Sequence, residues 1–315
     1  MEAEAALVWR WEVGEHRRYA IESEVVAPNP LWFYASRNAQ ARVIAWQVRV
    51  LVDCVADAAS SKRSLSIRCN VDDLGVMAAA MPGDQATARR AGLLTEILPE
   101  VDQRVTGATI ELSLRRDGRL EAFGLVGLPN RERREGLMAE NVRIVLSRAF
   151  AAFELPLPRS GAAEGGVWAH SRNVLFQAPT LIGTVGSAAF VNRATFGAEG
   201  LATIESAGRG VSQIGEGGIT LSMEHHGTAV FDVAGGGLVE RTWDVTGTPT
   251  ASSAGNEGTR APDYHQYGHL VRLAPGESFD VGETVEVDLP DAPTSLTVDP
   301  GPALEGAIPV RRKSW

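Results

Sequence analysis

The sequence predicts a mainly β protein of the α+β class, in which amphipathic helices pack on large curved antiparallel sheets or open half-barrels. The strongest sign is alternation. In residues 41–55 the even positions from Ile44 to Cys54 are apolar, whereas the odd positions include three polar or charged side chains. A strand points successive side chains to opposite faces, so this segment has one apolar face. Residues 64–72 alternate in the same way.

Cys54 and Cys69 lie opposite each other if these two segments form a hairpin around residues 59–63. The same register pairs Val52 with Val71 and puts both apolar sets on one face. Directly opposed residues have Cβ atoms close enough for a disulfide, and an oxidised pair would indicate an exported protein. The alternative is a pair of buried free thiols that pack as small hydrophobic groups.

Two helices are expected to interrupt the strands. The first follows Asp84, a candidate N-cap, and ends before Pro99. The second covers about residues 130–153, where apolar side chains recur at helical spacing and charged side chains occupy the opposite face. We expect both helices to lie across the apolar face of the sheet.

The chain is expected to divide into two similar β halves and a tail. The first half covers residues 1–157 and holds both helices, the second covers residues 158–289, and the Pro-rich residues 290–315 form a C-terminal tail. The internal repeat rests on the hairpin at residues 107–127, whose glycine turn recurs at residues 227–247. Both turns would need glycine at positive φ.

Composition excludes several classes of function. The 315 residues carry a formal net charge of -9, so a basic surface for nucleic acid is missing and we expect no DNA or RNA partner. The most apolar stretch, residues 41–55, contains four polar or charged side chains, which predicts no transmembrane span. No signal-peptide pattern is visible near Met1, which leaves a cytoplasmic protein or one whose leader has been removed.

The sequence contains no recognisable catalytic or cofactor motif. No serine occupies a nucleophile elbow. The glycine clusters at residues 208–210 and 215–218 lack a following helix and the full dinucleotide fingerprint, so we expect them in turns. We therefore expect a protein that is not an enzyme and that uses no cofactor and no metal.

The remaining alternative for chemistry is a site built from histidines. His265 and His269 would share one face of a strand, together with Asp263, as metal ligands should. His225 and His226 form a second pair, and all four histidines could belong to an enzyme site assembled from scattered residues.

An antiparallel meander with one continuous apolar face, interrupted by amphipathic helices, resembles the LolA and LppX type of bacterial periplasmic lipoprotein carriers. The resemblance is architectural and covers at most residues 9–245. It implies an incompletely closed barrel with the second helix as a lid over an apolar cavity. The cavity-lining residues it implies are Trp46, Val48, Leu137, Met138, Val142, Leu146 and Phe150. The alternative is that these side chains fill an ordinary core, because both roles share one sequence pattern.

The leading hypothesis is therefore a noncatalytic cell-envelope protein, in the periplasm or at the cell surface, that binds or carries a lipid or another apolar small molecule. The alternative is a structural or interaction component of a surface or secreted assembly. In that case the C-terminal tail would reach a protein partner.

Overall fold

A computed structural model describes most of the chain up to residue 279. The described residues are 7–28, 43–58, 60–79, 105, 107–126, 146, 149–158, 162, 164–176, 184–197, 199–214, 219–251 and 264–279. Met1–Gly282 form one compact unit, and Glu283–Trp315 form a second unit that lies outside the described residues. The expected C-terminal tail falls in that second unit.

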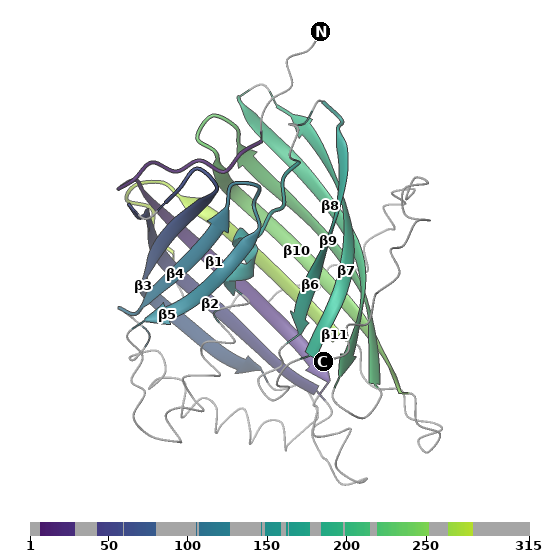
Figure 1. The fold of residues 1–315 in the computed structure, drawn as a ribbon. Coiled ribbons are helices and arrows are strands. Elements are labelled where there is room, and N and C mark those ends of the chain that lie inside the picture. The colour runs from purple at the N-terminus through teal and green to yellow at the C-terminus, as the bar shows by residue number, and fades with distance from the viewer. Residues whose placement is uncertain are drawn as a thin grey trace, which may run out of the picture. The chain divides into compact units, whose positions relative to one another are not determined.

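Eleven strands pair antiparallel in a single sheet with the order β5-β4-β3-β2-β1-β11-β10-β9-β8-β7-β6 (Figure 1). This confirms the prediction of a mainly β fold built on a large curved antiparallel sheet. The strands are β1 (His16–Pro28), β2 (Val43–Ala56), β3 (Ser64–Ala79), β4 (Thr109–Arg115), β5 (Leu120–Val126), β6 (Val167–Phe176), β7 (Thr184–Phe196), β8 (Leu201–Ile214), β9 (Ile219–Asp232), β10 (Gly237–Ala251) and β11 (Tyr264–Leu273).

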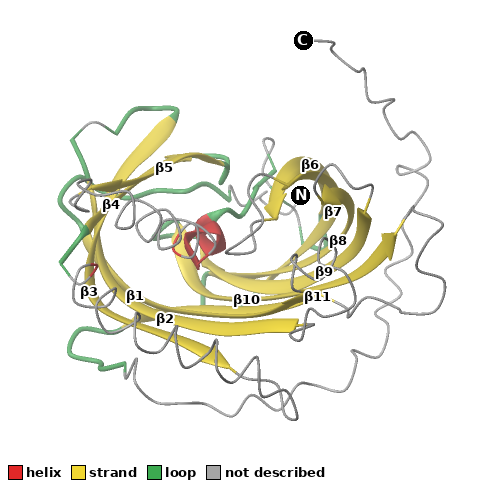
Figure 2. Cartoon of the chain, turned by 90° about the horizontal axis from the view of Figure 1, so that it is seen from below, coloured by secondary structure: helices red, strands yellow, loops and turns green. Residues whose placement is uncertain are grey.

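The chain path divides this sheet into two arms. β1 lies in the middle, and β2 to β5 step outward to one edge. β6 then takes the opposite edge, and β7 to β11 step inward until β11 pairs with β1. We call β1 to β5 the first arm and β6 to β11 the second arm. Figure 2 shows both arms curving toward the same side, which we call the concave face.

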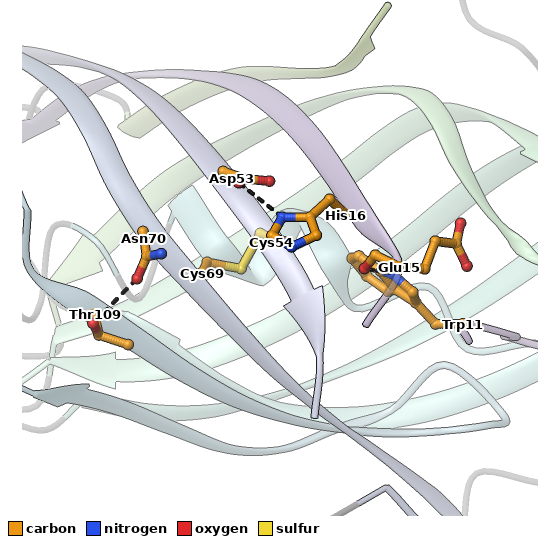
Figure 3. Close-up of a disulfide and its surroundings, with 8 residues drawn as sticks. All are labelled: Trp11, Glu15, His16, Asp53, Cys54, Cys69, Asn70 and Thr109. Atoms are coloured by element: carbon orange, nitrogen blue, oxygen red, sulfur yellow. Dashed lines mark hydrogen bonds and ion pairs between the residues drawn. A yellow bond between two sulfur atoms is a disulfide. The ribbon is translucent and has the colours of Figure 1, made fainter. Parts of the chain in front are cut away.

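The predicted hairpin register is confirmed. Cys54 of β2 lies opposite Cys69 of β3, Val52 lies opposite Val71, and the two cysteines form a disulfide (Figure 3). Both cysteines are fully buried. Beyond Val71 the ladder shifts by one residue. This bulge reverses the alternation in β3, so that Leu74 still faces the core.

The helical part of the predicted fold class is not supported by the described residues. The first expected helix lies outside them. Of the second, only Leu146, Ala149 and Phe150 are described as helical, followed by η1 (Ala151–Phe153), a single 3₁₀ turn. The fold that the structure supports is therefore mainly β, and amphipathic helices across the sheet stay a prediction.

The two hairpins that suggested an internal repeat share their turn chemistry. Gly118 between β4 and β5 has φ 79°, and Gly236 between β9 and β10 has φ 63°, as the sequence predicts. Their positions in the sheet differ, because β4 and β5 form an edge whereas β9 and β10 are internal. The two hairpins thus share a tight glycine turn, but they do not occupy equivalent positions in the sheet.

One apolar core covers the concave face and takes buried side chains from both arms. Trp9, Tyr19, Phe150 and Phe153 are among its largest fully buried side chains. Arg241 of the second arm reaches into this core, and its Nη1 donates hydrogen bonds to the carbonyl oxygens of Ala152 (2.7 Å) and Glu154 (2.6 Å). The buried guanidinium therefore ties the second arm to η1, which lies over the concave face (Figure 2).

Candidate functional site

The concave face changes character along the strands of the second arm. In one cross-strand row the residues of β7, β8 and β9 are Ala194, Ile204 and Ala229, which are aliphatic and buried in the main core. Arg241 of β10 continues this row. The next two rows mix aromatic, polar and glycine residues. We call the side chains of these two rows the mixed band. They are Trp168, His170, Phe190, Asn192, Ser206, His225, Trp243 and Val245.

Three polar side chains of the mixed band form a hydrogen-bonded chain across β8, β7 and β6. Ser206 Oγ donates to Asn192 Oδ1 (2.6 Å), and Asn192 Nδ2 lies 3.0 Å from His170 Nδ1. Asn192 is 1% exposed, so its amide needs both partners. Because the amide oxygen accepts from Ser206, the amide nitrogen donates to Nδ1, which places the ring proton of neutral His170 on Nε2.

This chain is not arranged for nucleophilic catalysis. An activated serine needs a base that can take its proton, whereas the Ser206 hydroxyl is bonded to an amide oxygen. The arrangement instead satisfies buried polar groups and fixes the orientation of an imidazole on the concave face.

An aromatic row lies beside the polar chain. The rings of Phe190 and His170 stack with centroids 4.9 Å apart, and His225 meets Phe190 edge-on at 5.1 Å. Phe190 reaches across β8 because Gly208 lies between them, where a Cβ would come within 2.5 Å of the Phe190 ring. The prediction that Gly208 and Gly210 occupy a turn is therefore wrong, since both lie inside β8. Glycine there makes room for a ring from the neighbouring strand.

A second glycine has the same role near the middle of the sheet. Trp243 of β10 pairs with Gly268 of β11, and a Cβ on Gly268 would come within 1.9 Å of the indole. Gly268 pairs in turn with Ser23 of β1, which pairs with Val48 of β2. The cross-strand row that holds Trp243 therefore continues from the second arm into the first, where Ser23 is its member in β1. We call this β1–β11 pairing the joint between the arms.

The four histidines do not form one site. His225 faces the concave side, whereas His226, His265 and His269 belong to rows of the opposite, outer face. His265 and His269 do share a face, but four residues of an extended strand separate them by about 13 Å. Among the described residues, no group of three or more His, Cys, Asp or Glu side chains is placed to hold a metal ion. Asp263 lies outside the described residues.

Each outer-face histidine of β11 instead contacts one carboxylate of β10. His265 Nε2 lies 2.8 Å from Asp244 Oδ2, and His269 Nε2 lies 3.0 Å from Glu240 Oε1. The hydrogen bond to Asp244 is the main cause that raises the pKa of His265 above its usual value, against partial burial. Cross-strand ion pairs of this kind stabilise a sheet surface.

The predicted ligand-binding residues fall into three groups. Val48, Leu146 and Phe150 are fully buried members of the same core cluster. Trp46 lies in β2 opposite Val25, but its side chain is not described. The others, Leu137, Met138 and Val142, lie outside the described residues. A fully buried side chain suits a filled core and a closed cavity wall equally well, so a ligand at these positions stays a prediction.

Sequence reasoning missed the mixed band, although one signal for it was present. The inward positions of β8 read Ser206, Gly208, Gly210 at a period of two, which leaves space on a face that should be apolar. Asn192 and Phe190 alternate inward in the same way on β7. Only the pairing of β6 to β9 places these residues side by side.

Within the described part of the chain, no helix combines the length and the apolar character needed to cross a bilayer.

Comparison with known proteins assigns no family. No protein-family model matches this sequence, and no curated protein matches it. Among solved structures, DynF from the dynemicin biosynthesis pathway of Micromonospora chersina is similar over 87% of this chain and 92% of its own, at 8% sequence identity and a TM-score of 0.21. A likeness at this TM-score carries no argument about fold or function.

Proposed function

We propose that this protein is a noncatalytic binding protein that holds or carries an apolar or lipid-like ligand on the concave face of its sheet. The observation that carries the proposal is the mixed band. There the aliphatic lining of the concave face gives way to aromatic rings and to a few polar groups that are already hydrogen-bonded to one another. A mainly apolar wall with a few fixed polar groups is typical of small-molecule sites.

The arrangement of polar groups favours binding over catalysis. The Ser206 hydroxyl donates to an amide oxygen, which is not a base, and the histidines are divided between the two faces of the sheet. Nucleophilic catalysis by a serine needs a base within hydrogen-bond reach of the hydroxyl. The polar groups of the mixed band instead support the position and orientation of a ligand.

We further propose an extracytoplasmic location, in the periplasm or at the cell surface. The buried disulfide between Cys54 and Cys69 supports it, because disulfides persist mainly in oxidising compartments. The resemblance to the LolA and LppX type of carrier supports a carrier role in the cell envelope.

Binding of N-phenyl-1-naphthylamine, a neutral apolar dye that brightens in apolar sites, tests the proposal. The wild-type protein should bind the dye, and Phe190→Ala should weaken binding by roughly 2-fold to 10-fold, because aromatic contacts contribute on that scale. Val191→Ala is the matched control. It changes the next residue of β7, which points to the opposite face, and it should bind the dye as the wild type does.

The absence of dye binding by the wild-type protein would contradict the proposal, and so would equal loss in the two variants. Native mass spectrometry of the protein as purified adds an independent measurement. We expect a bound apolar molecule that organic solvent extracts.

A further inference from the structure

Ser23 is a buried hydroxyl at the joint between the two arms. It belongs to the concave face, because it pairs with Val48 on one side and with Gly268 on the other. Its exposed fraction is 1%, and its Oγ has no hydrogen-bond partner among the described residues. A buried hydroxyl without a partner lowers the stability of the fold, and alanine would fit in its place.

Ser206, Asn192 and His170 of the mixed band already have hydrogen-bond partners. Asn192 uses its amide oxygen for Ser206 and its amide nitrogen for His170. The hydroxyl of Ser23 therefore differs from them, because it can still donate and accept at a wall formed by apolar side chains. Buried polar groups without a partner often mark the position of a ligand or an ordered water.

The neighbours of Ser23 indicate a neutral ligand. Val48 flanks it on one side, and the indole of Trp243 lies over Gly268 on the other. The nearest inward-facing charge along the adjacent row is Arg241, whose guanidinium already binds two carbonyl oxygens. A carboxylate or phosphate beside Ser23 would therefore lose its hydration without gaining a dedicated cation.

Two other buried polar atoms, on Arg17 and Tyr19, suit a ligand less well. Arg17 Nη1 and Tyr19 Oη meet at the turn before β10, where a Cβ on Gly237 would come within 2.0 Å of Nη1 and 4.0 Å of Oη. Backbone packs tightly there, and Arg17 also pairs with Glu15 at 2.7 Å. The Arg17 guanidinium at this turn is part of a structural network, because it also donates to the carbonyl oxygens of Arg10 and Gly235.

We propose that Ser23 Oγ anchors the polar end of the ligand, and that the ligand is a neutral, largely apolar molecule with a hydroxyl or carbonyl oxygen. The indole of Trp243 and the side chain of Val48 contact the apolar part next to that oxygen. This inference rests on the proposed function and adds to it the chemical class of the ligand and the atom that recognises it.

Two fluorescent probes that differ in one oxygen test the anchor, namely 1-pyrenemethanol and 1-methylpyrene. Ser23→Ala and Ser23→Val should bind 1-pyrenemethanol about fivefold more weakly than the wild type, which corresponds to one hydrogen bond. Both should bind 1-methylpyrene unchanged. Ser23→Thr has the shape of the valine variant and keeps the hydroxyl, so it should retain 1-pyrenemethanol binding.

Two controls separate the anchor from general damage. Ser113→Ala removes a hydroxyl from the outer face of β4 and should leave both affinities unchanged. In thermal unfolding without a probe, Ser23→Ala should melt above the wild type, because an unsatisfied hydroxyl has been removed.

Each other outcome overturns the inference in a recognisable way. If all variants bind both probes as the wild type does, or if Ser23→Ala melts below the wild type, the hydroxyl is satisfied within the protein or by water and the anchor is refuted alone. If the wild type binds neither probe, the proposed function fails together with the anchor.

Discussion

Removal of the disulfide should destabilise the protein by an amount that follows from its place in the chain. The Cys54–Cys69 bond joins residues that are 15 apart in sequence, and a loop of that length restricts the unfolded chain by about 3 kcal/mol at 25 °C. The double variant Cys54→Ala, Cys69→Ala should therefore lose about 3 kcal/mol of unfolding free energy. For a chain of this size the melting temperature should fall by roughly 6–12 °C.

Urea unfolding followed by tryptophan fluorescence measures this loss, with thermal unfolding by circular dichroism as the second readout. The hairpin should survive in the variant, because the other β2–β3 pairs remain and Val52 still packs against Val71. A reducing agent should lower the stability of the wild type to that of the variant and should leave the variant unchanged.

Equal unfolding free energies of the wild type and the double variant would refute the reasoning. Thiol titration of the denatured, unreduced protein gives an independent check. It should detect no free thiol, and two reactive thiols per chain would contradict both the bond and the proposed compartment.

Three further perturbations test the architecture by urea unfolding. Gly118→Ala should cost at least about 2 kcal/mol, because its φ is 79° and a Cβ would lie 1.7 Å from a backbone oxygen. Gly14→Ala, at φ 80° but in open space, should cost only the backbone strain of about 1 kcal/mol, and an equal loss in the two variants would contradict the close approach. Arg241→Met should lose about 2 kcal/mol or more, because it leaves two carbonyl oxygens of the η1 segment without their donor, whereas wild-type stability would show that this contact is dispensable. The pKa of His265 is raised in the folded state, chiefly by its hydrogen bond to Asp244. The stability it adds over His265→Gln should be fully present below its unfolded pKa of about 6.5 and lost as pH rises through the folded value. A difference between these two proteins that does not change from pH 5 to pH 9 would contradict that assignment.

The hairpin of β2 and β3 could be predicted because its information is local. The period of two in both segments fixes which side chains share a face, and a one-residue slip would turn every apolar side chain toward solvent. The register of Cys54 with Cys69 follows from that pattern together with the position of the polar connection at residues 59–63. The bulge beyond Val71 was missed, although the apolar positions of this segment change from odd, up to Val71, to even, from Leu74.

The candidate site could not be predicted in the same way, because its parts come from distant strands. Ser23 and Gly268 are neighbours only because β1 pairs with β11, the first strand with the last. Gly208 reads as a turn residue in sequence, and its role appears only when Phe190 lies beside it. His265 and His269 of β11 were predicted to share one face of a strand, and they do. The extended strand nevertheless keeps the two rings too far apart to bind one metal ion.

The sequence by itself determined the strand class, the disulfide register and the positive φ of the turn glycines Gly118 and Gly236, because each depends on residues close along the chain. The tertiary structure alone decided that the two arms join in one open sheet through the pairing of β1 with β11. It also decided that Trp243, Gly268 and Ser23 are neighbours at that pairing. Pairing between strands far apart in sequence depends on the collective burial of the whole concave face, and no local pattern specifies it.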